Sequence, residues 1–136
     1  IGTRAVNGKS FAILNSGFNN IYPEENKPLA IDIAKNGGLL SEYPPDKEYS
    51  PVRYKSSNRI IAGMAQAVIV TEFYNDSEVI LDLLSCCSQI GKLTFIMIDP
   101  MHGALTDKDC FNKAVSFGAI PLVGLDKTDD IIQSLV

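Results

Sequence analysis

The chain has 136 residues, of which 46% are hydrophobic and 21% are charged, a composition typical of globular rather than disordered proteins. This length allows one domain with a buried core, and we predict a single domain over residues 1–136. No apolar run approaches the ~20 residues that cross a bilayer, so we expect no membrane contact. The net charge of −4 argues against general coating of duplex DNA but permits a small basic site.

The cysteines and the single histidine form no pattern of a metal site or a disulfide framework. Cys86 and Cys87 are adjacent, Cys110 lies far along the chain, and no Cys-x-x-Cys pair occurs. We therefore expect reduced thiols, a cytoplasmic location and no metal ion. The glycine-rich motifs of dinucleotide and P-loop sites are absent, and no nucleophile-elbow motif surrounds a serine, so we expect no cofactor and no catalytic residue.

Short apolar runs alternate with segments of helical periodicity along the chain. Strands are predicted over residues 10–15, 38–42, 67–72, 93–99 and 119–123. Helices are predicted over residues 24–36, 58–64, about 77–90, 107–117 and from Asp126 or Thr128 to Leu135. Five alternations of strand and helix predict an α/β fold with three αβα layers and a mostly parallel sheet of about five strands. Pro121 cannot donate to a ladder, so the last strand is expected at an edge.

The stretch from residue 43 to residue 57 contains three prolines and no usable period, and we predict a long loop there. Ser56 or Ser57 is then the expected N-cap of the next helix, with Arg59 in its first turn. Asp76 or Ser77 is the expected cap of the helix after the third strand.

The residues that follow the strands are the candidate functional residues, because ligands of open α/β sheets bind beyond the strands' carboxyl ends. The densest positive cluster of the chain comprises Arg53, Lys55 and Arg59, with Tyr54 between them. Amides at the expected helix start could receive a phosphate oxygen, and Tyr54 could stack on a base. A solvated charged loop is an equally good interpretation of this cluster from composition alone. After the first strand, Gly17 and Asn19 are ordinary turn residues when taken alone.

Five segments of the chain occur in the same order and at similar spacing as the motifs of a known family. They are AILNSGFNNIYPEEN, GGLLSEYPP, SSNRIIAGMAQAVIVTE, GK-TFIMI and CFNKAVSFGA. Together they resemble the DprA/Smf family of DNA-processing proteins over residues 9–131. The resemblance implies a Rossmann-like fold and a recombination mediator of natural transformation. Such a protein binds single-stranded DNA in a positive pocket and delivers it to a RecA-type recombinase, with no catalytic step.

The resemblance also assigns site residues by position. Asn58 and Arg59 match the last two residues of the family's Arg-Asn-Arg motif, and Ser41 and Glu42 match its Leu-Leu-Ser-Glu. Asn112 matches the asparagine of Gly-x-Asn. Four further residues match the first turn: Gly17, Tyr22, Pro23 and Asn26.

Several positions depart from the family pattern. Ser57 replaces the first arginine of Arg-Asn-Arg, Glu78 replaces the glycine of Ser-Gly-x-Leu, and Cys110 replaces the glycine of Gly-x-Asn. The family's N-terminal half, with its Gly-Ser-Arg turn, is not in this sequence. We therefore expect residues 10–15 to form an uncovered apolar edge, which predicts a homo-oligomer or a covering upstream segment.

Two alternatives stay open at this stage. A related Rossmann-like fold could bind or sense a nucleotide-derived ligand without cleaving it, because the region 72–82 carries no glycine-rich phosphate turn. A degenerate family member could also act through protein contacts alone, which the acidic balance and the lost arginine and glycine positions would favour.

Overall fold

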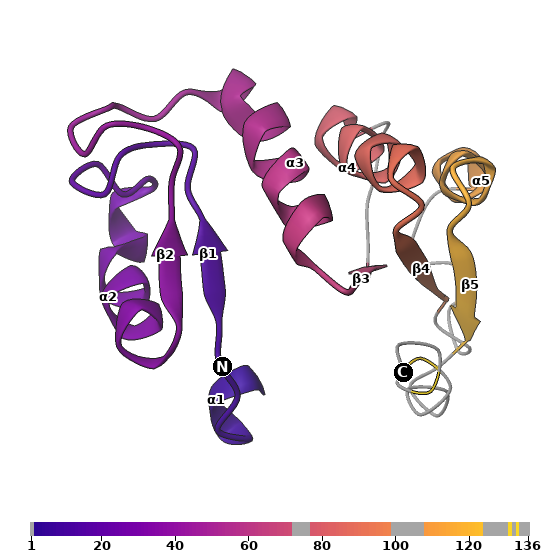
Figure 1. Cartoon of the computed structure of the whole chain (residues 1–136), viewed down its shortest axis with the longest axis horizontal. Helices are drawn as coiled ribbons and strands as arrows, with labels where there is room; N and C mark the ends of the chain where they lie inside the picture. Colours follow the sequence, from indigo (N-terminus) through magenta and orange to yellow (C-terminus); the bar gives the residue numbers. More distant parts are fainter. Residues whose placement is uncertain (1, 72–76, 99–107, 124–130, 132, 134–136) are drawn as a thin grey trace. The chain divides into compact units, whose positions relative to one another are not determined.

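A computed structural model describes residues 2–71, 77–98, 108–123, 131 and 133 (Figure 1). The chain divides into two compact units, Ile1–Ser57 and Asn58–Val136, which we call unit 1 and unit 2. None of the described helices combines the length and the apolar character that a membrane span requires. The single domain over residues 1–136 stays a prediction.

Unit 1 is a small two-stranded parallel sheet with a helix against it (Figure 1). Its elements in chain order are α1 (Gly2–Ala5), β1 (Phe11–Ile13), the 3-10 turn η1 (Glu24–Asn26), α2 (Lys27–Asn36), β2 (Gly38–Leu40) and the 3-10 turn η2 (Pro51–Arg53). Strands β1 and β2 pair with Ala12 opposite Leu39, and α2 packs on both strands. Pro28 fits the first turn of α2, where a missing N–H group costs nothing.

Unit 2 contains a three-stranded parallel sheet in the order β3-β4-β5. Its elements follow α3 (Tyr54–Met64), which begins at the end of unit 1, and are β3 (Ala67–Val70), α4 (Glu78–Gln89), β4 (Leu93–Ile98), α5 (Lys108–Ser116) and β5 (Ile120–Val123). In the described ladder β5 pairs with β4 alone, and Pro121 lies opposite Ile96. The edge position predicted from Pro121 is confirmed.

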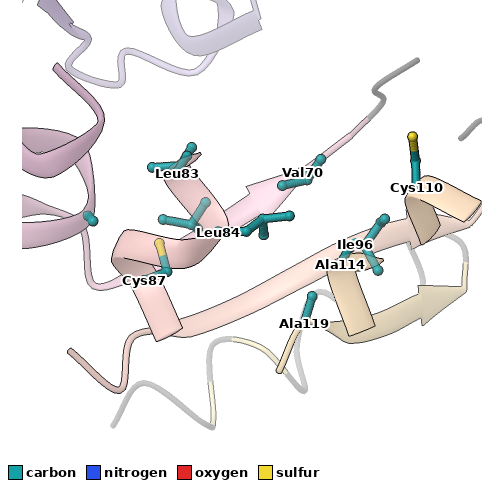
Figure 2. Close-up of a cluster of buried hydrophobic side chains, with 10 residues drawn as sticks. Val70, Leu83, Leu84, Cys87, Ile96, Cys110, Ala114 and Ala119 are labelled. Carbon is teal, nitrogen blue, oxygen red and sulfur yellow. The ribbon is translucent and has the colours of Figure 1, made fainter. Parts of the chain in front are cut away.

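Both faces of the β3-β4-β5 sheet carry buried apolar side chains. Figure 2 shows the larger cluster, in which Val70 and Ile96 of the sheet meet Leu84 and Cys87 of α4 and Ala114 of α5. The opposite face holds a second cluster of Phe95, Leu122 and Ile131. This alternation along β4 is the pattern of a strand covered on both sides, and it explains the nearly continuous apolar run in the sequence.

The structure confirms the α/β class and the parallel pairing but changes several predicted boundaries. The described strands form two ladders rather than one of about five strands. Strand β1 is three residues long, not six, and α3 begins at Tyr54 rather than at Asn58. Ser77 stands at the predicted N-cap of α4, but its side chain makes no capping hydrogen bond. The cap Asp76 lies outside the described residues, as does the helix predicted to follow Asp126 or Thr128, except for Ile131 and Gln133.

The early start of α3 has a simple cause. The 3-10 turn of Pro51–Arg53 leads directly into the helix, so the predicted loop ends at Ser50. Ser56 and Ser57 therefore lie inside α3, and the Ser57 hydroxyl donates to the backbone oxygen of Tyr54 at 2.9 Å. Serine often makes such a bond to the preceding turn of a helix, which means that neither residue is the N-cap.

Candidate functional site

The loops that follow β1 and β2 are joined by backbone hydrogen bonds. The Gly17 N–H group donates to the Lys47 carbonyl at 2.7 Å, and the Asn19 N–H group donates to the Pro45 carbonyl at 2.9 Å. Gly17 is buried, and a Cβ atom built on it would lie 2.1 Å from the Pro44 oxygen and 2.2 Å from the Pro45 oxygen. Only glycine therefore permits this close approach. We call the joined loops, residues 14–20 and 41–53, the loop clamp.

Polar side chains add to the loop clamp. The Asn19 Nδ2 atom donates to a carboxylate oxygen of Asp46 at 2.7 Å, and the Asn20 Nδ2 atom donates to the Asp46 carbonyl at 2.8 Å. The Ser41 hydroxyl donates to the Ser16 carbonyl at 2.7 Å and accepts the Tyr43 N–H group at 3.0 Å. Three predicted ligand contacts, Gly17, Asn19 and Ser41, thus have internal partners that hold the two strand ends together.

Arg53 is also part of the loop clamp. Its guanidinium donates to the Asn15 carbonyl at 3.4 Å and to the Glu48 carbonyl, and it lies 4.9 Å from the centre of the Tyr43 ring. These contacts fix the side chain, and no carboxylate pairs with it among the residues that the structure describes. Arg53 therefore contributes a positioned charge to this end of unit 1 rather than a freely moving one.

Helix α3 carries two exposed cationic side chains one turn apart. Lys55 and Arg59 are spaced four residues apart in this helix, which places them on one of its faces. Lys55 forms no ion pair with any residue that the structure describes. Arg59 lies in the second turn, not the first, because α3 starts at Tyr54. The helix-start amides that were predicted to receive a phosphate oxygen therefore lie at the Tyr54 end of α3, before Ser56 and Ser57, and their role stays a prediction.

Asn58 is buried, and its amide group ties α3 to α4. The Nδ2 atom donates to the Val79 carbonyl at 2.7 Å and to a carboxylate oxygen of Asp82 at 3.0 Å. Both amide hydrogens are therefore used inside unit 2, and Asn58 has a structural role in this conformation. Ser57, where the family has arginine, is buried as well.

The remaining predicted residues lie at the surface or near it. Tyr54 is half-buried at the start of α3, and Glu42 is exposed after β2. Asn112 is exposed on α5 in unit 2. Solvent can reach each of these residues, and each stays a predicted contact to DNA.

The positions that depart from the family pattern have structural explanations. Glu78 is the first residue of α4, where a carboxylate is stabilised by the positive end of the helix dipole. Cys110 is almost fully buried between α5 and the sheet. The other two cysteines also lie in environments that disfavour the thiolate. Burial raises the pKa of the Cys87 thiol, and burial together with the charge of Asp82 raises the pKa of Cys86. Among the described residues no group of histidine, cysteine and acidic side chains could hold a metal ion.

One aromatic pair was not predicted from the sequence. Tyr22 and Tyr49 stack with ring centres 4.1 Å apart. They are 27 positions apart in the sequence, and no motif or periodicity links two residues at that separation. Their contact depends on the folding of the two loops against one another.

Comparison with known proteins decides the family. The family model of DNA recombination-mediator protein A matches residues 2–135. The chain belongs to this family. The resemblance read from its motifs is thereby confirmed over nearly the whole sequence.

Similarity to curated relatives supports the same family. The chain is 40% identical over 100 residues to DNA processing protein DprA of Bacillus subtilis, covering 71% of this chain and 33% of that protein. It is 43% identical over 67 residues to Protein Smf of Synechocystis sp., covering 49% of this chain and 17% of that protein. The chain therefore spans a third or less of the length of these relatives.

Solved structures agree on the fold. The X-ray structure of DprA from Streptococcus pneumoniae matches with a TM-score of 0.73 and 27% identity, over 88% of this chain and 41% of that one. A Helicobacter pylori structure, described by its single-stranded DNA binding mode, matches with a TM-score of 0.73 and 21% identity, over 92% of this chain and 55% of that one. The chain has the Rossmann-like α/β fold of these DprA proteins.

Proposed function

We propose that this chain is a single-stranded DNA-binding module of a recombination mediator, acting in DNA uptake, and that it has no catalytic activity. Family membership over residues 2–135 supports this role. The Helicobacter pylori protein, whose structure is described by its single-stranded DNA binding mode, supports the choice of ligand.

The observation that carries the proposal is the pair of exposed cations on α3. In an acidic chain, Lys55 and Arg59 concentrate positive charge on one helix face, and local potential governs the approach of a polyanion. Each side chain donates charge-assisted hydrogen bonds to phosphate oxygens. Such contacts carry no sequence information, so this face binds the DNA backbone.

Further residues take part in the proposed mechanism. Tyr54, next to Lys55, stacks on one base, because every base offers a π-face to an aromatic ring. Arg53 adds charge from a fixed position in the loop clamp. The other candidate contacts are Gly17, Asn19, Ser41, Glu42, Asn58 and Asn112. Of these, the internally bonded ones position the loops and α3, and the exposed Asn112 is free to meet a sugar or phosphate.

Two partners belong to the same proposal: a RecA-type recombinase that receives the DNA, and a second copy of this chain. The support for self-association is β1, whose described pairing is with β2 alone and whose Phe11 is 60% exposed. An uncovered apolar strand edge pairs readily with another strand. Gel filtration with light scattering should therefore return a species larger than a monomer, and a clean monomer would contradict this partner.

The DNA-binding proposal is tested by fluorescence anisotropy with a short labelled oligo-dT. We expect micromolar or tighter binding that weakens as salt rises. Arg59→Ala should weaken it at least about tenfold, since a hydrogen bond to a charged group contributes about 1.5–3 kcal/mol. Arg59→Lys should retain most of the affinity, and Lys35→Ala, on the exposed end of α2, serves as the matched control. Binding that ignores both salt and Arg59→Ala would refute the assignment.

A further inference from the structure

A second surface of unit 1 has the features of a small-molecule site. The rings of Tyr22 and Tyr49 stack nearly parallel, with 4.1 Å between centres and 14° between planes. Tyr22 nevertheless remains 62% exposed and Tyr49 36% exposed. A ring that rests on one neighbour and is still mostly exposed offers its other face to a further aromatic group.

The two tyrosines line a hollow of about 610 Å³ that lies wholly within unit 1. Its polar lining comprises Asn19, Asn20, Glu24, Glu25, Lys27 and Glu48. Asp46 holds the two asparagine amides on the rim through hydrogen bonds of 2.7 and 2.8 Å. The rim is thus fixed by the loop clamp, and the volume falls within the roughly 300–1,000 Å³ range of ligand sites.

The charge of the hollow selects the kind of ligand. The lining contains three carboxylates and one ammonium group, and that ammonium group, Lys27 Nζ, is paired with Glu24 at 2.8 Å. The hydrogen bond from Lys27 lowers the pKa of Glu24, so this carboxyl stays ionised at neutral pH. Glu25 and Glu48 leave the rim net negative, which repels phosphate and attracts N–H donors.

We propose that this hollow binds an amino-bearing nucleobase, above all cytosine, stacked on Tyr22 with its exocyclic amino group donating to Glu48. The proposal deepens, and rests on, the single-stranded DNA binding proposed above. Carboxylates accept from the N4 amino group of cytosine, whereas thymine presents a carbonyl oxygen at the same position. That oxygen would face a carboxylate without a hydrogen between them, so thymine is disfavoured. The phosphates of the strand stay outside the negative rim.

The test compares oligo-dC with oligo-dT of equal length, two pyrimidine strands that differ at this position. The wild-type chain should bind oligo-dC about fivefold more tightly, at the low end of the discrimination seen for a carboxylate on cytosine. Tyr22→Leu and Glu48→Gln should each bring the ratio close to one. Tyr22→Phe should retain the preference because it keeps the ring.

Two matched controls separate this effect from general changes. Phe11→Leu removes another exposed ring, and Glu78→Gln removes one negative charge from unit 2; both should leave the oligo-dC preference unchanged. Equal wild-type affinities for the two strands would overturn the proposal, and so would a preference that survives both Tyr22→Leu and Glu48→Gln.

A titration with nucleosides tests the base site separately from the proposed binding of single-stranded DNA. If neither strand binds the wild-type chain, the proposed function fails, and NMR signals of the Tyr22 and Tyr49 rings then decide the base site. Shifts caused by 2′-deoxycytidine but not by thymidine would support it. The absence of shifts with both nucleosides would overturn it even if oligo-dT binds.

Discussion

Each of the two units is stabilised internally by a different kind of interaction. In unit 2, α4 and α5 bury Leu84, Ile96 and Cys87 in an apolar cluster (Figure 2). In the described part of unit 1, Ala30 is the one buried apolar side chain, and the strand ends are joined by polar contacts. Polar ties hold loops in place without covering them, so unit 1 can present fixed groups to solvent, whereas unit 2 supplies a stable sheet.

The largest loss of stability should come from a substitution in the loop clamp. Gly17→Ala places a methyl group 2.1 Å from the Pro44 oxygen, and backbone on both sides leaves it no room. We expect a loss of about 4 kcal/mol or more in the free energy of unfolding, the range of severe core strain. Urea denaturation measures it, and hydrogen exchange should locate the loss in residues 14–20 and 41–53.

The same substitution in α3 is the matched control. A Cβ atom on Gly63 would meet nothing within 4 Å, so Gly63→Ala should stabilise the helix by about 1 kcal/mol. Equal effects at Gly17 and Gly63 would mean that the loops are not clamped.

The next largest effect should come from the core of unit 2. Leu84 is 1% exposed, and Leu84→Ala leaves a cavity beside Ile96 that should lower the free energy of unfolding by about 3 kcal/mol. Leu29→Ala on α2, where the leucine is 51% exposed, should cost about 0.5 kcal/mol or less. Similar losses for both leucines in urea denaturation would contradict the division between the units.

A smaller loss is expected at the link between α3 and α4. Asn58→Ala leaves the Val79 carbonyl and the Asp82 carboxylate without this donor, which should cost about 2 kcal/mol in urea denaturation. Asn112→Ala, on the exposed face of α5, is the control and should change stability little. If Asn58→Ala abolished DNA binding at unchanged stability, Asn58 would be a direct contact after all.

The smallest effect concerns rates rather than stability. Cys86 is the one cysteine that is only partly buried, and its pKa is raised above the ordinary thiol value of 9.0. A raised pKa means less reactive thiolate at a given pH, so labelling of Cys86 should be slow near neutral pH and should keep accelerating as the pH rises beyond 9.0. A free-cysteine peptide is the reference, and labelling of Cys86 as fast as the peptide would contradict the shift.

The elements of unit 2 were the easiest to predict. Continuous apolar runs indicated β3 and β4, and Pro121 indicated an edge strand, because burial on both faces and a missing N–H group leave direct marks in the sequence. The start of α3 was missed because Ser56 and Ser57 look like caps, whereas a 3-10 turn at Pro51 had already begun the helix.

The roles of single site residues depended on contacts that spacing does not reveal. Asn58 looked like a ligand contact by family position, but its partners Val79 and Asp82 follow more than 20 positions later. Gly17 looked like an ordinary turn glycine until the loop around Pro44 was seen against it. The cluster of positive charge that includes Lys55 and Arg59 was predictable, because a cluster of charged residues is visible in the sequence itself.

The most direct test of the central claim is the salt dependence of oligo-dT binding by the wild-type chain and by the double variant Lys55→Ala/Arg59→Ala. Each phosphate contact to a single strand contributes about 0.7 to the slope of log K against log salt concentration. We predict that the double variant loses about 1.4 of that slope together with most of its affinity. An unchanged slope and affinity would contradict the assignment of single-stranded DNA to the exposed cations of α3.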